Sequence, residues 1–185
     1  MPLSGPPWIA RFPTSVNVHD LAPAFRGNVT RFRAALRAAG ANVDINATLR
    51  PPQRAYLMHY SWRIARELLD PATIPAMAGV DIQWLHRTPR NQPNPAASRQ
   101  AAEQMVRGYE LVVRPALQSR HTQGLAIDVD IAWQGTLSIR NASGQDVNID
   151  NAPRNGGNTR LQAVGATYGV IKLASDPPHW SSDGH

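Results

Sequence analysis

The chain contains no cysteine among its 185 residues. This absence excludes disulfide bonds, zinc sites built on thiolates and cysteine nucleophiles, and it leaves the redox compartment open. No stretch approaches the ~20 apolar residues that a membrane-spanning helix needs, and the first residues do not combine a basic start with an apolar run. We therefore expect no membrane span and no signal peptide, so that other means would carry the protein from the cytoplasm to any substrate outside it.

Lysine is almost absent as well. Lys172 is the single lysine, whereas the chain has eighteen arginines and a net charge of +6. Ala, Arg and Pro are all abundant, which is typical of a GC-rich genome, so codon bias accounts for the imbalance. Attraction to a polyanion, either nucleic acid or an anionic cell wall, is the alternative. The arginines are spread along the chain without a recognised nucleic-acid motif, and we expect no nucleic-acid partner.

Hydrophobic residues make up 42% of the chain and charged residues 17%, as in a folded globular protein, and the length suits a single domain. Helices come first and strands later, which predicts an α+β domain with a small antiparallel sheet flanked by helices. Residues 1–20 are expected to form an N-terminal arm, and residues 70–97 a Pro-rich insertion at the rim of a cleft.

The hydrophobic spacing and the turn residues predict the individual elements. Helices are expected over roughly 21–39, 51–69, 96–117 and 159–169, with a short one near 80–85 and with Ser98 as the candidate cap of the third. Strands are expected near 41–50, 125–133, 135–141, 146–150 and 170–175.

The stretch SRHTQGLAIDVD, residues 119–130, places His121 in a polar loop just before a predicted strand. Gly124 allows a tight turn there. Period-two alternation then points the apolar residues to one side of the strand, and Asp128 and Asp130 to the other. Two carboxylates on one face are costly if that face is buried and they lack partners. Either this face is open to solvent or the carboxylates have a role.

A second stretch, SDPPH at residues 175–179, places Asp176 three residues before His179. A Pro-Pro pair favours polyproline geometry with three residues per turn, so we expect both side chains on one side of an extended segment. Their backbones would then lie ~9 Å apart, a distance that two side chains leaning toward a shared ion and its water can bridge.

The two stretches together offer the ligands of one metal ion. Catalytic zinc prefers three His or carboxylate ligands with a fourth position left for water, and His121, Asp128 and His179 supply that set. Another first-row divalent ion would suit the same ligands. A zinc hydrolase also needs a carboxylate that takes a proton from the water. The three glutamates all lie in predicted helices, and Asp176 is the only carboxylate adjacent in sequence to the second histidine, so we assign this role to Asp176.

The segment SRHTQGLAID resembles the SxHxxGxAxD pattern of the zinc peptidases that cut peptidoglycan stem peptides. These include D-alanyl-D-alanine carboxypeptidases and dipeptidases, L-alanyl-D-glutamate endopeptidases of phage lysins, and the Hedgehog signalling domain. DPPH resembles their second motif, in which an acidic residue precedes the last histidine ligand by three positions. The resemblance covers roughly residues 40–180 and implies the Hedgehog-like fold of that group. The matching positions of the first motif are Ser119, His121, Gly124, Ala126 and Asp128.

The resemblance implies a zinc-dependent hydrolase of the peptidoglycan stem peptide. Many carboxypeptidases carry Glu at the position of Asp176, whereas the L-alanyl-D-glutamate endopeptidases often have Asp in a DPPHF-like string, so we expect cleavage between L-Ala and D-Glu. Trp180 stands here in place of that Phe. By the same resemblance, Arg50 would stabilise the oxyanion and Gln53 would contact substrate, although the family spaces this pair differently.

Several alternatives stay open at this point. Arg50 is alternatively a surface residue at a helix start, and Ser119 is either a hydrogen-bond partner of a ligand or substrate, or a simple loop hydroxyl. The chain could also be a D-alanyl-D-alanine carboxypeptidase, or a zinc-binding or wall-binding module without activity. We expect a monomeric, compact lysin of the phage-endolysin type, with a tail-associated enzyme, a secreted effector and a host enzyme as the other routes to the wall.

Overall fold

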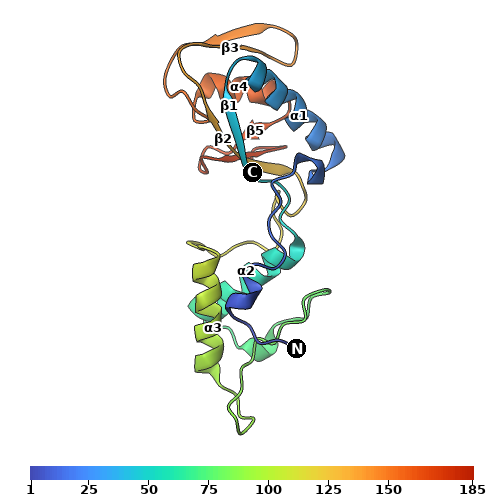
Figure 1. Cartoon of the computed structure of the whole chain (residues 1–185), viewed down its shortest axis with the longest axis vertical. Helices are drawn as coiled ribbons and strands as arrows, with labels where there is room; N and C mark the ends of the chain where they lie inside the picture. The colour runs from blue at the N-terminus through green and yellow to red at the C-terminus, as the bar shows by residue number, and fades with distance from the viewer. The chain divides into compact units, whose positions relative to one another are not determined.

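The computed structural model describes residues 1–185 and has an α+β fold with four α-helices and a small antiparallel sheet, as the order of predicted elements indicated (Figure 1). None of these helices is both long enough and apolar enough to cross a membrane. The helices are α1 (Pro23–Ala38), α2 (Pro52–Arg66), α3 (Pro95–Gly108) and α4 (Thr159–Thr167). Short 3-10 helices are η1 (Pro6–Trp8), η2 (Val18–Asp20) and η3 (Pro71–Thr73).

The strands form one four-stranded sheet and one hairpin. The sheet has the order β1-β2-β6-β5, and every neighbouring pair in it is antiparallel. Its strands are β1 (Asn42–Ala47), β2 (Ala126–Ala132), β5 (Ile171–Lys172) and β6 (His179–Ser181). The separate hairpin consists of β3 (Leu137–Arg140) and β4 (Asp146–Ile149).

The chain folds into two compact units, each assembled from segments that are distant in the sequence. The first unit comprises residues 1–13 and 51–118 and contains α2 and α3. The second comprises residues 14–50 and 119–185 and contains the sheet, the hairpin, α1 and α4. That residues 1–185 act as a single zinc peptidase domain, with residues 70–97 at the rim of its cleft, stays a prediction.

In the second unit, α1 forms because its apolar residues recur at helical spacing and share one face. Phe25, Val29, Phe32 and Leu36 are each at most 2% exposed in the main core, as their spacing predicted. Gly40 then ends the helix in a left-handed conformation with φ of 86°. The helix α1 contacts β1 and α4 contacts β5, the two edge strands of the sheet, and both helices contribute to this core.

Strand alternation decides which side chains of the sheet face this core. Ile127, Val129 and Ile131 of β2 point into it, so Asp128 and Asp130 point to the opposite face, as the sequence predicted. Trp180 of β6 is fully buried against Phe32, with ring centroids 5.6 Å apart. Its neighbour His179 therefore points to the same face as Asp128, which is its partner across the strands.

The first unit packs α2 against α3 around a second core that includes Trp8, Leu57 and Met105. The short helix expected near residues 80–85 does not form there. Val80, Ile82 and Trp84 are buried at every second residue, a strand-like period, and the backbone of Gln83 bonds to Pro2 and Ser4 of the N-terminal arm. The prediction failed because a partner distant in sequence satisfies this backbone.

The third predicted helix was also too long, and its cap was placed wrongly. Asn94 caps α3 by accepting a hydrogen bond from the Ala97 amide (3.1 Å), and Ser98 lies buried inside the helix. The helix ends at Gly108 rather than near residue 117. Val112 and Val113 beyond it are 87% and 69% exposed, so no core supports a further helical turn.

The extended Pro-Pro segment expected at residues 176–179 is likewise absent. The His179 amide donates a hydrogen bond to the Asp176 carbonyl (3.1 Å), which closes a turn around the two prolines. This turn belongs to the hairpin loop between β5 and β6, and strand β6, which the sequence did not predict, begins directly after it at His179. Pairing with β2 overrides the local polyproline preference.

Candidate metal centre

Three predicted ligands converge on one face of the sheet in the second unit. The distances from Asp128 Oδ1 to His121 Nε2 and to His179 Nδ1 are both 3.1 Å, and the two ring nitrogens lie 3.2 Å apart. The group meets the geometric requirements for holding a metal ion. Both histidine side chains are at most 9% exposed, whereas that of Asp128 is 21% exposed, so the cluster opens to solvent on the carboxylate side.

Backbone carbonyls fix both imidazole rings from outside the cluster. His121 Nδ1 lies 2.7 Å from the Thr48 carbonyl oxygen, and His179 Nε2 lies 3.2 Å from that of His185. A carbonyl oxygen only accepts, so each outward nitrogen carries the hydrogen, and each neutral ring turns a bare lone pair inward. Two lone pairs and a carboxylate oxygen therefore meet without a hydrogen between them, and only a cation or an added proton relieves their repulsion.

The spacing of these three atoms suits zinc. A tetrahedral zinc ion with bonds of about 2.0–2.1 Å holds its ligand atoms about 3.3 Å apart. The distances of 3.1–3.2 Å in the cluster are close to that value. Outward N–H groups bonded to carbonyls are also the usual support of histidine ligands. The three residues thus fit a zinc ion. Other first-row divalent ions accept the same ligands, so the geometry does not select zinc over them.

The electrostatics of the cluster also favour positive charge. Burial alone would raise the pKa of Asp128, but His121 and His179, which donate hydrogen bonds to its carboxylate when they are protonated, hold that pKa well below its usual range. Burial alone would lower the pKa of His179, but the hydrogen bond and charge of Asp128 outweigh it and raise that pKa, with help from the His185 carbonyl and the Asp176 charge. The ion-free protein therefore binds a proton at His179 more readily than a free imidazole does.

We expect the ion-free protein to lose stability as pH rises through the raised pKa of His179. A raised folded pKa contributes stability that is fully present below the unfolded value of about 6.5 and is lost above the folded one. Urea unfolding with a chelator, from about pH 5.5 to about pH 9, measures this. Asp128→Asn should flatten that part of the pH dependence, and an unchanged pH profile in this variant would contradict the account.

The turn before β2 sets the position of His121. The Gly124 amide donates to the His121 carbonyl (3.2 Å), and the Gly124 carbonyl accepts from the Ala22 amide (2.9 Å). Gly124 has φ of 69°, and a Cβ added there would lie 2.9 Å from the Ala22 nitrogen. Glycine is therefore required both by the backbone conformation and by the close approach of the segment before α1.

Replacing Gly124 with alanine is expected to destabilise the protein and weaken zinc binding. Gly135→Ala is the matched control, because Gly135 has a similar φ of 66° but nothing within 4 Å of an added Cβ. The conformational cost alone is about 1–2 kcal/mol, and Gly124→Ala should exceed it because the backbone must also shift. Denaturant unfolding and zinc titration of both variants check this; equal effects would show that the close approach is unimportant.

Asp176, the predicted base, lies on the hairpin loop that leads into His179. Its side chain is exposed, and its charge contributes to the raised pKa of His179, so its carboxylate lies within electrostatic reach of the cluster. An exposed carboxylate beside an open metal site can exchange protons with water at that site. The predicted role is compatible with this placement.

The other predicted site residues have less direct relations to the cluster. The Arg50 amide donates to the His121 carbonyl (3.0 Å), which places the Arg50 backbone beside this ligand. Ser119 exchanges hydrogen bonds with Thr122 in the turn that carries His121, so its hydroxyl has a local partner. Gln53 lies on α2 in the first unit, where its amide is close to Gly79, and its role as a substrate contact stays a prediction.

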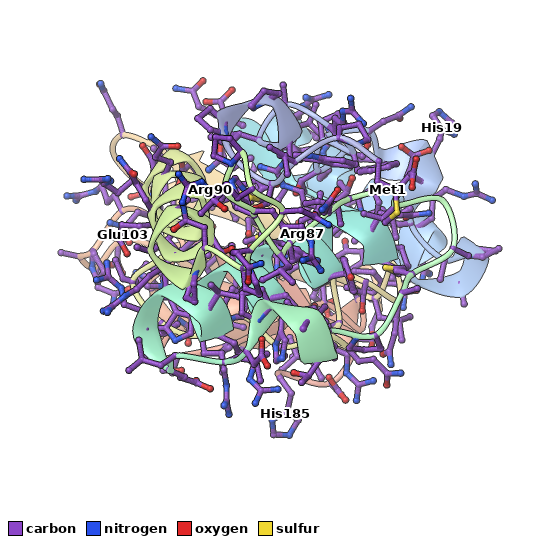
Figure 2. All side chains as sticks on the ribbon, turned by 90° about the horizontal axis from the view of Figure 1, so that it is seen from below. Met1, His19, Arg87, Arg90, Glu103 and His185 are labelled. Atoms are coloured by element: carbon purple, nitrogen blue, oxygen red, sulfur yellow. The ribbon has the colours of Figure 1, made fainter.

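Some residues that shape the site were missed in the sequence. Thr48 and His185 act through backbone carbonyls, and a carbonyl leaves no side-chain signal. The His185 ring itself points outward in Figure 2, so only its backbone serves His179. Ser181 holds that backbone in place, because its hydroxyl accepts from the amides of Gly184 and His185. Lys172 was visible as the single lysine, but codon bias was the explanation given for it.

In comparisons with known proteins, no family model matches the chain, and no curated protein matches it significantly. The candidate function therefore depends on the chemistry of the cluster and on the motif positions that surround it.

Proposed function

We propose that the protein is a zinc-dependent peptidase that hydrolyses the stem peptide of peptidoglycan, at the bond between L-Ala and D-Glu. The observation that carries the proposal is the convergence of His121, Asp128 and His179 with both outward ring nitrogens anchored on carbonyls. The spacing of His121 and Asp128 within the SxHxxGxAxD pattern, and Asp176 three residues before His179, support the choice of reaction.

Each residue would have one task in this reaction. His121, Asp128 and His179 would hold zinc, which supplies an activated water at neutral pH and polarises the substrate carbonyl. Asp176 would take a proton from the attacking water and deliver it to the leaving amine. Arg50, whose backbone adjoins His121, would place a guanidinium near the oxygen that becomes negatively charged.

The number of ligand residues and the partial exposure of Asp128 support a catalytic role over a purely structural one. A structural zinc site is closed by four protein ligands, whereas a catalytic site keeps one position open. The cluster has three ligand residues, and its carboxylate side chain is 21% exposed. Solvent, and with it a substrate carbonyl, can therefore reach the open side.

The choice of L-Ala–D-Glu over terminal D-Ala depends on the aspartate of the DPPH stretch. Mass spectrometry of purified peptidoglycan digested by the protein, with and without a chelator and added zinc, tests this. Release of D-Glu peptides from glycan that retains L-Ala, abolished by the chelator, is the expected result. Loss of only terminal D-Ala would replace the proposed bond by the carboxypeptidase alternative, and no cleavage by folded, zinc-loaded protein would contradict the proposal altogether.

A further inference from the structure

Lys172, the single lysine of the chain, is the last residue of β5 and lies at the mouth of the hairpin loop 173–178. This loop carries Asp176 and ends at the ligand His179. The Lys172 side chain folds back over its own loop. Its ammonium Nζ lies 2.5 Å from the Leu173 carbonyl oxygen, 2.5 Å from that of Asp176 and 3.1 Å from that of His179. An ammonium has three N–H donors, so these bonds use all of them.

The same three carbonyls also hold the loop together through the backbone. The Asp176 amide donates to the Leu173 carbonyl (3.2 Å), the His179 amide to the Asp176 carbonyl (3.1 Å), and the Leu173 amide to the His179 carbonyl (3.1 Å). Each oxygen thus accepts one backbone N–H and one ammonium N–H, which uses both of its lone pairs. The result is a closed ring of three residues, Leu173, Asp176 and His179, around one cation.

This ring explains why lysine stands here in a chain that otherwise uses arginine eighteen times. An ammonium is a compact point charge whose three donors diverge from one nitrogen, so it can bond three oxygens that surround it. A guanidinium is planar and presents its donors as a fork, which suits a carboxylate but not a ring of carbonyls. Because codon bias favours arginine throughout the chain, the lysine at position 172 indicates that an ammonium group is required there.

We propose that Lys172 is a positioning residue that presets the loop carrying Asp176 and His179 for metal binding and catalysis. The part concerning His179 requires only the metal centre, and the part concerning Asp176 rests on the proposed function. Without the ammonium, the three carbonyls would retain only their backbone partners, and the loop would sample conformations in which His179 Nδ1 leaves the cluster. Zinc would then bind more weakly because its site would have to be ordered first.

A role through charge alone predicts the opposite sign. A positive charge close to a divalent ion repels it, so its removal would strengthen zinc binding. Positioning predicts that removal weakens zinc binding. A purely structural role in the fold would lower the melting temperature without changing the coordination of a metal bound well below that temperature. The direction of the change in affinity therefore separates these roles.

The absence of cysteine allows a graded test at this position. Lys172→Cys would introduce a unique thiol, which 2-bromoethylamine alkylates to a close analogue of lysine after unfolding, followed by refolding. The mono-, di- and trimethylated reagents give side chains of the same positive charge with two, one and no N–H donors. Iodoacetamide gives a neutral product. Zinc affinity, by competition with a chromophoric chelator, and the visible spectrum of bound cobalt(II) are measured for each product.

We expect zinc affinity close to wild type for the aminoethyl product and a stepwise decrease as donors are lost, to about 10–100-fold weaker for the trimethylammonium and neutral products. The cobalt spectrum should change in the same order. Lys172→Arg, which keeps the charge, should bind like the trimethylammonium product. Equal affinity across the methylated series, or tighter binding by the neutral product, would overturn the proposal.

The same samples separate this proposal from the proposed function. If wild-type protein binds zinc but cleaves no peptidoglycan, the peptidase assignment fails, while the affinity series still decides the role of Lys172. If the wild type cleaves peptidoglycan but every alkylated product binds zinc equally well, the positioning role fails and the peptidase assignment stands. Exposed Arg140, replaced by Met, controls for loss of one positive charge elsewhere in the second unit.

Discussion

Replacing Asp176 with asparagine is expected to abolish stem-peptide hydrolysis while leaving zinc affinity nearly unchanged. Asp176 is exposed and is not among the three ligand residues, so its loss removes a proton acceptor rather than a metal ligand. A general base contributes typically 10²–10⁴-fold to the rate, and kcat should fall by about that factor. Measuring peptide release by mass spectrometry at saturating substrate, together with zinc affinity of the same variant, checks both halves of this expectation.

Asp146→Asn is the matched control for this experiment. Asp146 is also exposed in the second unit, and it pairs with Arg140 on the separate β3–β4 hairpin. The control should retain wild-type hydrolysis and zinc affinity. If Asp176→Asn retains more than about a tenth of wild-type kcat, Asp176 is not the base, since even the weakest such role contributes about 10²-fold.

Replacing Asp128 with asparagine is expected to weaken zinc binding by more than about 100-fold. Loss of a residue that only hydrogen-bonds a metal ligand already lowers metal affinity by about 10–100-fold, and Asp128 is itself a ligand. Asp128 is the only anionic residue of the three ligands, and both histidine nitrogens lie 3.1 Å from its Oδ1. The variant should also lose hydrolysis at zinc concentrations that saturate the wild type. Competition with a chromophoric chelator measures the affinity.

Asp130→Asn is a close control, because Asp130 lies two residues along the same strand and on the same face. Its carboxylate accepts a hydrogen bond from Asn46 (2.8 Å) and is exposed. Zinc affinity in this variant should stay within about threefold of wild type, as expected for a solvent-exposed charge outside the ligand set. Equal losses in the two variants would show that the strand's negative charge, rather than coordination by Asp128, attracts the ion.

The parts of the fold that follow local periodicity were predictable from the sequence. The helix α1 and the alternation along β2 depend on which residues face the core, and period alone reveals that. The failures lie where a distant partner decides the backbone. Residues 80–84 pair with the N-terminal arm instead of forming a helix, and the prolines after Asp176 form a turn because β6 pairs with β2.

The candidate ligands were predictable because metal chemistry restricts residue types and spacing, and His121, Asp128 and His179 do lie together. Their supports were not, since the carbonyls of Thr48 and His185 belong to the backbone and any residue supplies one. Lys172 is intermediate between these cases. Its rarity was visible, but its three carbonyl partners depend on the loop conformation, which the sequence pattern misjudged.

The most direct test of the central claim is a titration of zinc into metal-stripped protein while release of peptide from peptidoglycan is followed. We predict that the stripped protein is inactive, and that activity rises linearly with zinc and reaches its plateau at one equivalent per chain. The three ligand residues form one cluster, so one ion should suffice. Full activity in the stripped protein, or no activity at any amount of zinc, would contradict the assignment of this cluster as a catalytic zinc site.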